Sequence, residues 1–185
     1  MLLESAADVI VETGPSSGVA AVARRAGVSK GALQHHFDTK TDLLIAVVSK
    51  GWEDLVGRFD RVADVSRPPE ERLRALVGAM WDSYQQPTCR AAFMISSDPN
   101  LDPNLADHLA PIFDVARVRL DETWRQIFAD LDVPGERLGD ARRFVRSHLL
   151  GMLVQRQLPS EEPEPERELA RLCIAAFEIL TAPES

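Results

Sequence analysis

A short segment early in the chain concentrates side chains that can contact nucleic acid. Lys30 and Lys40 carry positive charge, and Gln34, His35 and His36 carry hydrogen-bonding groups. Such groups contact phosphate oxygens, or the base edges in the major groove of duplex DNA. The segment therefore predicts a surface that binds duplex DNA.

These side chains need a helix that presents them, and the surrounding residues predict one. Gly27 follows a short apolar helical segment and stands where a helix end favours a left-handed residue. Ser29 can cap the next helix, while Val28 and Leu33 can pack together across that cap. The pattern predicts a sharp turn and then a short helix over residues 30–36.

A second helix start follows almost immediately. Thr39 and Asp42 have the spacing of a capping box, which places Lys40 in the first turn of the new helix. The positive end of a helix beside a lysine favours a phosphate group. From Leu43 the apolar pattern continues to about Val62, so we expect one long helix that links two domains.

The order of these residues resembles the TetR/AcrR family of bacterial transcriptional regulators over about the first fifty residues. Beyond about residue 55, the likeness is mainly one of architecture. The matching motifs are Leu2-Leu3-Glu4-Ser5-Ala6-Ala7 through Gly14, Val22-Ala23, Ala26-Gly27-Val28-Ser29-Lys30-Gly31, Leu33, His36-Phe37 and Lys40.

The resemblance implies a DNA-binding helix-turn-helix and divides its residues into two groups. Those expected to face the bases and the groove are Lys30, Gly31, Ala32, Gln34 and His35, and those expected nearer the phosphates are Ser17, Ser29, His36 and Lys40.

Three features depart from the family pattern. Gln34 stands where relatives usually carry an aromatic residue, so it can read adenine N6 and N7 or only reach a phosphate. Gly18 replaces a common Thr or Ser, which leaves Ser17 as the expected substitute at that helix end. The first predicted helix begins at once, without the basic arm that many relatives place ahead of it.

The charge is distributed in a way that suits a local DNA-binding face. The chain has a net charge of −8, yet all its lysines lie between residues 17 and 50, a segment with a net charge of +3. The acidic remainder is expected to repel DNA and so to orient docking.

Composition and periodicity predict an all-α protein. Hydrophobic residues make up 45% of the chain, and no alternating strand pattern stands out. No apolar run is long enough to span a membrane, and no signal peptide is apparent, so we expect a cytoplasmic protein without membrane partners. Cys89 and Cys173 lack metal-ligand spacing and are expected to be reduced and buried.

Neither an enzyme nor a cofactor site is indicated. The chain has no Gly-rich phosphate loop, no HExxH motif and no nucleophile elbow. Asp98, Asn100 and Asp102 imitate the start of a calcium loop, but Pro103 occupies the position of its glycine. His35 and His36 point about 100° apart on a helix and cannot share a metal.

The remaining chain predicts five further helices. They fall over about residues 70–84, 91–95, 105–131, 138–157 and 166–180, with a solvated loop over 159–165. Asp98-Pro99 and Asp102-Pro103 each have the pattern of a cap followed by a first-turn proline. Pro111 is expected to kink or restart its helix.

The last two helices are apolar around most of their circumference, which favours a partner surface. We expect a two-fold four-helix interface with a second copy of the chain; the alternative is that both helices are buried in a monomer. The interface residues expected are Leu149, Gly151, Leu153, Leu172, Ala176 and Leu180.

The resemblance also implies a cavity for a small effector in the larger domain. An effector of mainly apolar character would suit the inward-facing aromatic and methionine side chains, although each of them can equally be ordinary core. The candidate residues are Trp81, Tyr84, Phe93, Met94, Phe113, Arg117, Trp124, His148 and Met152.

Together these patterns predict a DNA-binding domain over residues 1–48 and a helical ligand-binding and dimerisation domain over residues 49–185. The expected function is a homodimeric transcriptional repressor that a small effector releases from a near-palindromic operator. The alternative is a protein-interaction module whose helix-turn-helix no longer binds DNA.

Overall fold

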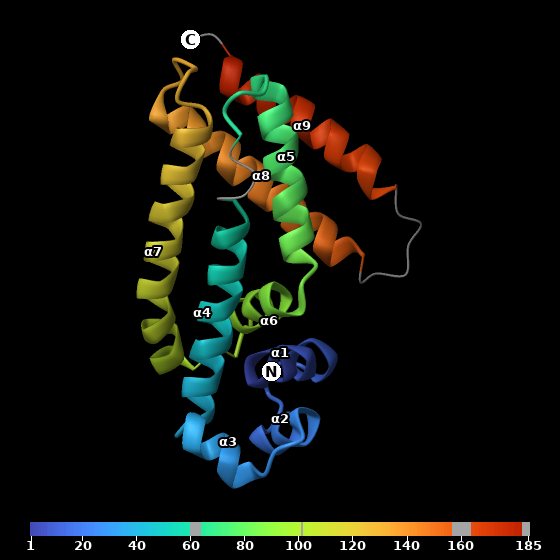
Figure 1. The fold of residues 1–185 in the computed structure, drawn as a ribbon, viewed down its shortest axis with the longest axis vertical. Coiled ribbons are helices and arrows are strands. Elements are labelled where there is room, and N and C mark those ends of the chain that lie inside the picture. The colour runs from blue at the N-terminus through green and yellow to red at the C-terminus, as the bar shows by residue number, and fades with distance from the viewer. Residues whose placement is uncertain (60–63, 101, 157–163, 183–185) are drawn as a thin grey trace. The chain divides into compact units, whose positions relative to one another are not determined.

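The computed structural model describes residues 1–59, 64–100, 102–156 and 164–182, and every regular element in these ranges is a helix (Figure 1). The predicted all-α class is therefore confirmed. The helices are α1 (Leu2–Thr13), α2 (Val19–Ala26), α3 (Lys30–His36), α4 (Lys40–Phe59), α5 (Pro69–Tyr84), α6 (Pro87–Ser96), α7 (Pro103–Ile127), α8 (Gly135–Gln155) and α9 (Pro165–Thr181).

The chain forms two compact units. Unit 1 comprises residues 1–55 and 85–116, and unit 2 comprises residues 56–84 and 117–185. A division at residue 48 therefore does not coincide with the compact units, because α6 and the first half of α7 pack into unit 1. The helices α4 and α7 each contribute residues to both units.

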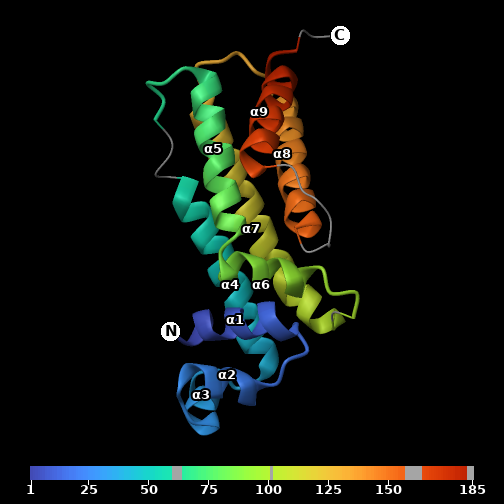
Figure 2. The same ribbon diagram turned by 90° about the vertical axis from the view of Figure 1, so that its right-hand side faces the viewer.

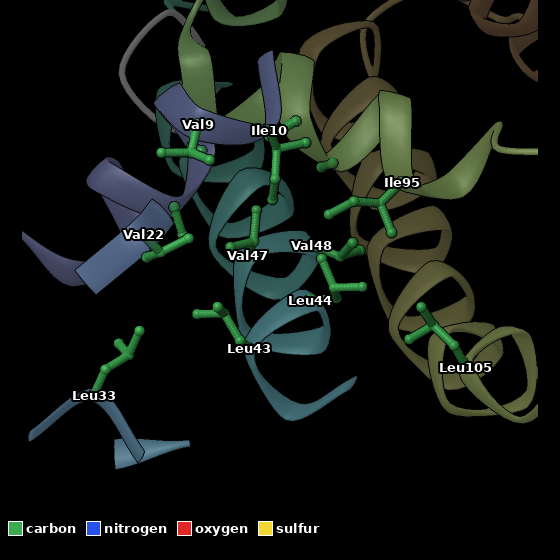
Figure 3. Close-up of a cluster of buried hydrophobic side chains, with 14 of the residues drawn as sticks. Val9, Ile10, Val22, Leu33, Leu43, Leu44, Val47, Val48, Ile95 and Leu105 are labelled. Atoms are coloured by element: carbon green, nitrogen blue, oxygen red, sulfur yellow. The ribbon is translucent and has the colours of Figure 1, made fainter. Parts of the chain in front are cut away.

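Unit 1 is built around an apolar cluster to which α1, α2, α3, α4, α6 and α7 contribute. Ile10 of α1 is 2% exposed, and Val47 of α4 and Ile95 of α6 are fully buried. Figure 3 shows Val22 and Leu33 pointing into the same cluster as Leu43 and Val47. The helix-turn-helix is thus one wall of a larger core.

A close contact joins α4 to α6 at Gly51. The Cys89 thiol donates to the Gly51 carbonyl over 3.2 Å. Three residues later along α4, Asp54 accepts a 3.0 Å hydrogen bond from the Thr88 hydroxyl. A Cβ on Gly51 would lie 2.7 Å from the Thr88 carbonyl oxygen and 2.8 Å from the Ala92 Cβ, so only glycine fits there without movement.

Unit 2 places α5 against both α8 and α9, and α8 against α9 (Figures 1 and 2). A buried arginine ties α5 to the end of α7: Arg72, 3% exposed, donates to both carboxylate oxygens of Asp130 at 2.6 Å and also to the Ile127 carbonyl. This hydrogen bonding keeps the pKa of Arg72 above its ordinary value and the pKa of Asp130 below its ordinary value.

Three details differ from the sequence-based expectations. The helix expected at 91–95 is longer, because Pro87 supplies its first turn as α6, where the missing N–H carries no penalty. Asp98 does not cap a helix; it accepts from the Asn100 amide in a turn, whereas Asp102 does cap α7 by accepting from the Asn104 amide at 2.9 Å. The helix continues through Pro111, so the expected restart is wrong and the expected kink stays a prediction.

Two expectations lie partly outside the described residues. The sequence predicts that the long linking helix ends near Val62, which lies beyond the last described residue of α4, Phe59. The solvated loop over 159–165 falls almost entirely within 157–163, which the structure does not describe.

The α4–α6 contact predicts different outcomes for two glycines of α4. Gly51→Ala should lower the free energy of unfolding by about 1–3 kcal/mol, since the new methyl group meets backbone on α6. Gly57→Ala, which meets nothing within 4 Å, should raise it by up to about 1 kcal/mol through helix propensity. Chemical denaturation of both variants measures the difference, and equal effects would contradict the close contact.

Candidate nucleic-acid interface

The turn between α2 and α3 has the geometry predicted from its glycine. Gly27 has φ 68° and ψ 26°, a left-handed conformation that other residues adopt only at a cost. The Val28 amide then donates to the Ala23 carbonyl over 3.0 Å and closes the end of α2. The chain can therefore reverse direction within three residues.

Ser29 starts α3 as predicted. Its backbone is extended, and its hydroxyl oxygen accepts a 3.0 Å hydrogen bond from the Ala32 amide. The cap stabilises a helix of 7 residues, which is too short to be stable by itself. An additional anchor must therefore hold α3 on the protein.

Leu33 is that anchor. It is fully buried and is the sole buried residue of α3, while the half-buried Val28 and Phe37 on either side belong to the same apolar cluster. Figure 3 shows the Leu33 side chain pointing from α3 toward Leu43. Every other residue of α3 is exposed: Lys30, Gly31, Ala32, Gln34, His35 and His36.

Helix geometry orders these exposed residues around Leu33. At about 100° per residue, Gly31 and His35 lie opposite Leu33, with Gln34 and Ala32 on the two flanks. A Cβ at Gly31 would meet nothing closer than the Ser29 hydroxyl at 3.9 Å, so glycine is not required here by packing. Gly31 near the centre of this face and Ala32 on its flank are both small, which lets a surface approach the α3 backbone there.

The first turn of α4 is fixed by the predicted capping box. The Thr39 amide donates to the Asp42 carboxylate over 2.9 Å, and the Asp42 amide donates to the Thr39 hydroxyl over 3.1 Å. The box does not use the amides of Lys40 and Thr41, which lie in the same turn. Lys40 is half-buried at this position.

The polar residues around the N-terminal end of α2 are partly engaged. Ser17 is half-buried and donates its hydroxyl proton to the Gly14 carbonyl, with its oxygen 2.6 Å from the Thr13 hydroxyl. Gly18 is the cap residue of α2 and offers no side chain. Ser17 can therefore donate to a phosphate only by giving up its bond to Gly14.

The basic residues near the interface differ in their availability. Arg25 is ion-paired with Glu12, and Lys50 is ion-paired with Asp54. The hydrogen bond from the Lys50 ammonium to the Asp54 carboxylate raises the pKa of Lys50. Arg24 is exposed in the last turn of α2, beside the turn. Arg24 is not among the DNA-binding residues that the sequence predicts; the basic pair Arg24-Arg25, directly before the Ala-Gly of the turn, is the signal that indicates it.

The effector candidates do not all belong to one unit. Phe93, Met94 and Phe113 are half-buried in unit 1, where Phe113 contacts Trp52 with ring centroids 5.9 Å apart. The other six are in unit 2: Trp81, Tyr84, Trp124 and Met152 are buried, His148 is half-buried and Arg117 is exposed.

Two polar groups in unit 2 have contrasting surroundings. The indole N–H of Trp124 is buried and has no hydrogen-bond acceptor among the described residues. His148 lies 3.8 Å from Glu168, which also pairs with Arg171 at 2.9 Å. Trp124 thus keeps an unused donor, whereas His148 already faces a carboxylate.

The expected interface residues of α8 and α9 are mostly interior. Leu149, Leu153, Leu172, Ala176 and Leu180 are between 0 and 7% exposed because they pack inside unit 2, and of the expected six only Gly151 is exposed. The exposed apolar side chains on these helices are instead Phe144, Val154 and Ile174.

Neither a metal site nor a membrane span emerges from the described parts of the chain. No three His, Cys, Asp or Glu side chains there are grouped so as to hold a metal ion. None of the described helices combines the length and apolarity needed to cross a membrane.

Comparison with known proteins places the helix-turn-helix in a family. Residues 2–47 match the family model described as "Bacterial regulatory proteins, tetR family". The match covers α1, α2, α3 and the start of α4, which are the elements that carry the interface described above.

Two named relatives share the N-terminal half. The transcriptional activator FasR of Mycolicibacterium smegmatis is 31% identical over 106 residues, covering 57% of this chain and 48% of that protein. The transcriptional regulator BetI of Burkholderia mallei is 37% identical over 86 residues, covering 45% of this chain and 44% of that protein. The similarity thus spans about half the length of these relatives.

Solved structures share the whole fold at low sequence identity. A transcriptional regulator from Rhodococcus is 22% identical, with a TM-score of 0.76 over 97% of this chain and 94% of that chain. The regulator PfmR from Thermus thermophilus is 20% identical, with a TM-score of 0.65 over 100% of this chain and 99% of that chain. The likeness extends the shared architecture to the C-terminal helices.

Proposed function

Because this chain belongs to the tetR family of bacterial regulatory proteins, we propose that it is a transcriptional regulator that inserts α3 into the major groove of duplex DNA. The observation that carries the proposal is the anchoring of α3. One residue, Leu33, attaches the helix to the core, and the six other residues of α3 are exposed.

The residues of this face have different roles. Lys30, Ser29, His36 and Lys40 position the protein on the phosphates, and Arg24 is a further phosphate contact in this proposal. Gln34 and His35 reach the base edges, because they stand on the part of α3 turned away from the core. Gly31 and Ala32 allow the helix to approach the groove closely.

Selection of bound duplexes from a random DNA pool tests this function. We expect a two-fold symmetric consensus and an affinity that falls steeply with salt concentration. Lys30→Ala should weaken all duplexes alike and reduce the salt slope by about one per recognition helix, whereas Gln34→Ala should relax selectivity at one base pair of each half-site by roughly 5- to 150-fold.

Each result has a distinct meaning. Uniform weakening by Gln34→Ala would leave Gln34 as a phosphate contact and refute its base-reading role. If nothing is enriched even at low salt, the regulator proposal fails and the alternative, a protein-interaction module with a degenerate helix-turn-helix, takes its place.

Dimerisation supplies the second recognition helix that a symmetric operator requires. We propose that the outer faces of α8 and α9 form the interface, through Phe144, Gly151, Val154 and Ile174. The proposed interface is supported by the exposure of three large apolar side chains: Phe144, Val154 and Ile174 are 38%, 45% and 63% exposed.

Ile174→Asp should therefore convert a dimer into a monomer, because the interface would have to bury an unpaired carboxylate. Val115→Asp is the matched control, since Val115 is a similarly exposed valine, 62%, on α7. Sedimentation velocity at micromolar concentration measures both. A wild-type protein that sediments only as a monomer would refute the proposed interface.

An effector of mainly apolar character is proposed to control the operator affinity through unit 2. Buried Trp81, Tyr84 and Met152 supply apolar surface, and the unpartnered Trp124 N–H can donate to an oxygen of the ligand. Since α4 contributes residues to both units, its arrangement can couple them, and coupling of about 1–3 kcal/mol alters affinity roughly 5- to 150-fold.

Repression is the expected direction of control, with release of the operator when the effector binds. A screen of small aromatic and acyl compounds for release of a labelled operator duplex identifies such an effector. Unchanged operator affinity in the presence of a compound shown to bind the protein would contradict the coupling.

A further inference from the structure

His35 holds a particular place on the exposed face of α3. It lies opposite the buried Leu33, at the point of the helix surface farthest from the core. Side chains of a helix lean toward its N-terminus, so an imidazole at this position extends over Gly31, one turn earlier. Because Gly31 has no side chain, nothing on the helix shields His35 from a bound surface.

A second imidazole stands beside the first. The rings of His35 and His36 have centroids 6.0 Å apart and meet edge to face, and the His36 ring also contacts Phe37. Two positive charges at this separation repel each other.

The charged residues of the helix-turn-helix segment are mainly cationic, although Arg25 is ion-paired with Glu12. Lys30 lies on the same helix, Arg24 and Arg25 end α2, and Lys40 begins α4. The acidic neighbours are Asp38 and Asp42, and Asp42 is engaged in the capping box. In the described parts of the chain, the sole histidine ion pair joins His148 to Glu168, far along the sequence.

From this geometry we propose that His35 is a base-reading residue of α3 and that it enters the groove as an imidazolium, so that operator binding takes up a proton. The inference rests on the proposed DNA-binding function. An imidazolium donates from both ring nitrogens: one N–H can donate to O6 or N7 of a guanine, and the other, which points away from that base, can donate to a phosphate. The segment itself has more cationic than acidic residues, whereas bound phosphates add the negative charge that favours the protonated ring.

The consequence is an affinity that depends on pH in the range where imidazoles titrate, about pH 6 to 8. The charged form binds more tightly, so affinity is high at the acidic end and is lost as the pH rises. If an imidazole gains one pKa unit in the groove, affinity at pH 6 exceeds that at pH 8 by roughly sixfold per recognition helix.

The experiment measures the affinity of the full chain for its selected duplex between about pH 6 and pH 8, at constant ionic strength. His35→Gln should abolish the pH dependence while keeping a hydrogen-bonding side chain. His36→Gln removes a proposed phosphate contact, so it should lower the affinity at every pH but retain most of the pH dependence. His108→Gln is the matched control, because His108 is exposed on α7 with its Nδ1 2.6 Å from the Asn104 carbonyl oxygen.

A wild-type affinity that does not change with pH would overturn the inference but leave the regulator proposal intact. A pH dependence that survives in His35→Gln and disappears in His36→Gln would also overturn the inference, because the proton would then be bound by His36. Absence of binding to any duplex at every pH would contradict the regulator proposal itself, and the inference would fall with it.

Discussion

The burial of one leucine determines what the N-terminal part of this chain can present to a partner. Leu33 fills a place in the apolar cluster of unit 1, and the seven residues of α3 have no other buried side chain. The turn at Gly27 and the cap at Ser29 bring Leu33 to that place. Because one anchor suffices, the rest of the helix surface is free of packing constraints and available for recognition.

The cluster that receives Leu33 is larger than a helix-turn-helix alone provides. It includes Ile95 of α6 and Leu105 and Leu109 of α7, which come from far along the sequence. The contact at Gly51 holds α6 against α4 closely enough to exclude a methyl group. The position of α3 on the core therefore depends on helices that its own sequence motif does not contain.

The local elements of the interface could be predicted because their causes are local. The left-handed glycine, the serine cap and the capping box each act within four residues, and the structure has all three where the sequence placed them. Long-range consequences were less accessible. Helical periodicity identifies Leu149 and Leu172 as apolar, but it does not distinguish the core of their own unit from a partner surface.

The same limit applies to the effector candidates. Helical spacing predicts that the aromatic residues face inward, but it does not predict which of them share a core. Phe93 and Phe113 belong to unit 1, whereas Trp81 and Trp124 belong to unit 2. A proline in the sequence likewise does not by itself predict where a helix begins or ends. Pro87 starts a helix, Pro99 lies in a turn, and α7 continues through Pro111. Each outcome depends on tertiary packing that a single-sequence pattern does not contain.

Replacing each side chain of α3 in turn and measuring the free energy of unfolding tests the single anchor most directly. Leu33→Ala should cost about 2–5 kcal/mol, whereas Lys30→Ala, Gln34→Ala, His35→Ala and His36→Ala should each change stability by less than about 0.5 kcal/mol. A loss shared among the exposed positions, or a tolerated Leu33→Ala, would show that α3 is held by its outer face and would contradict the account.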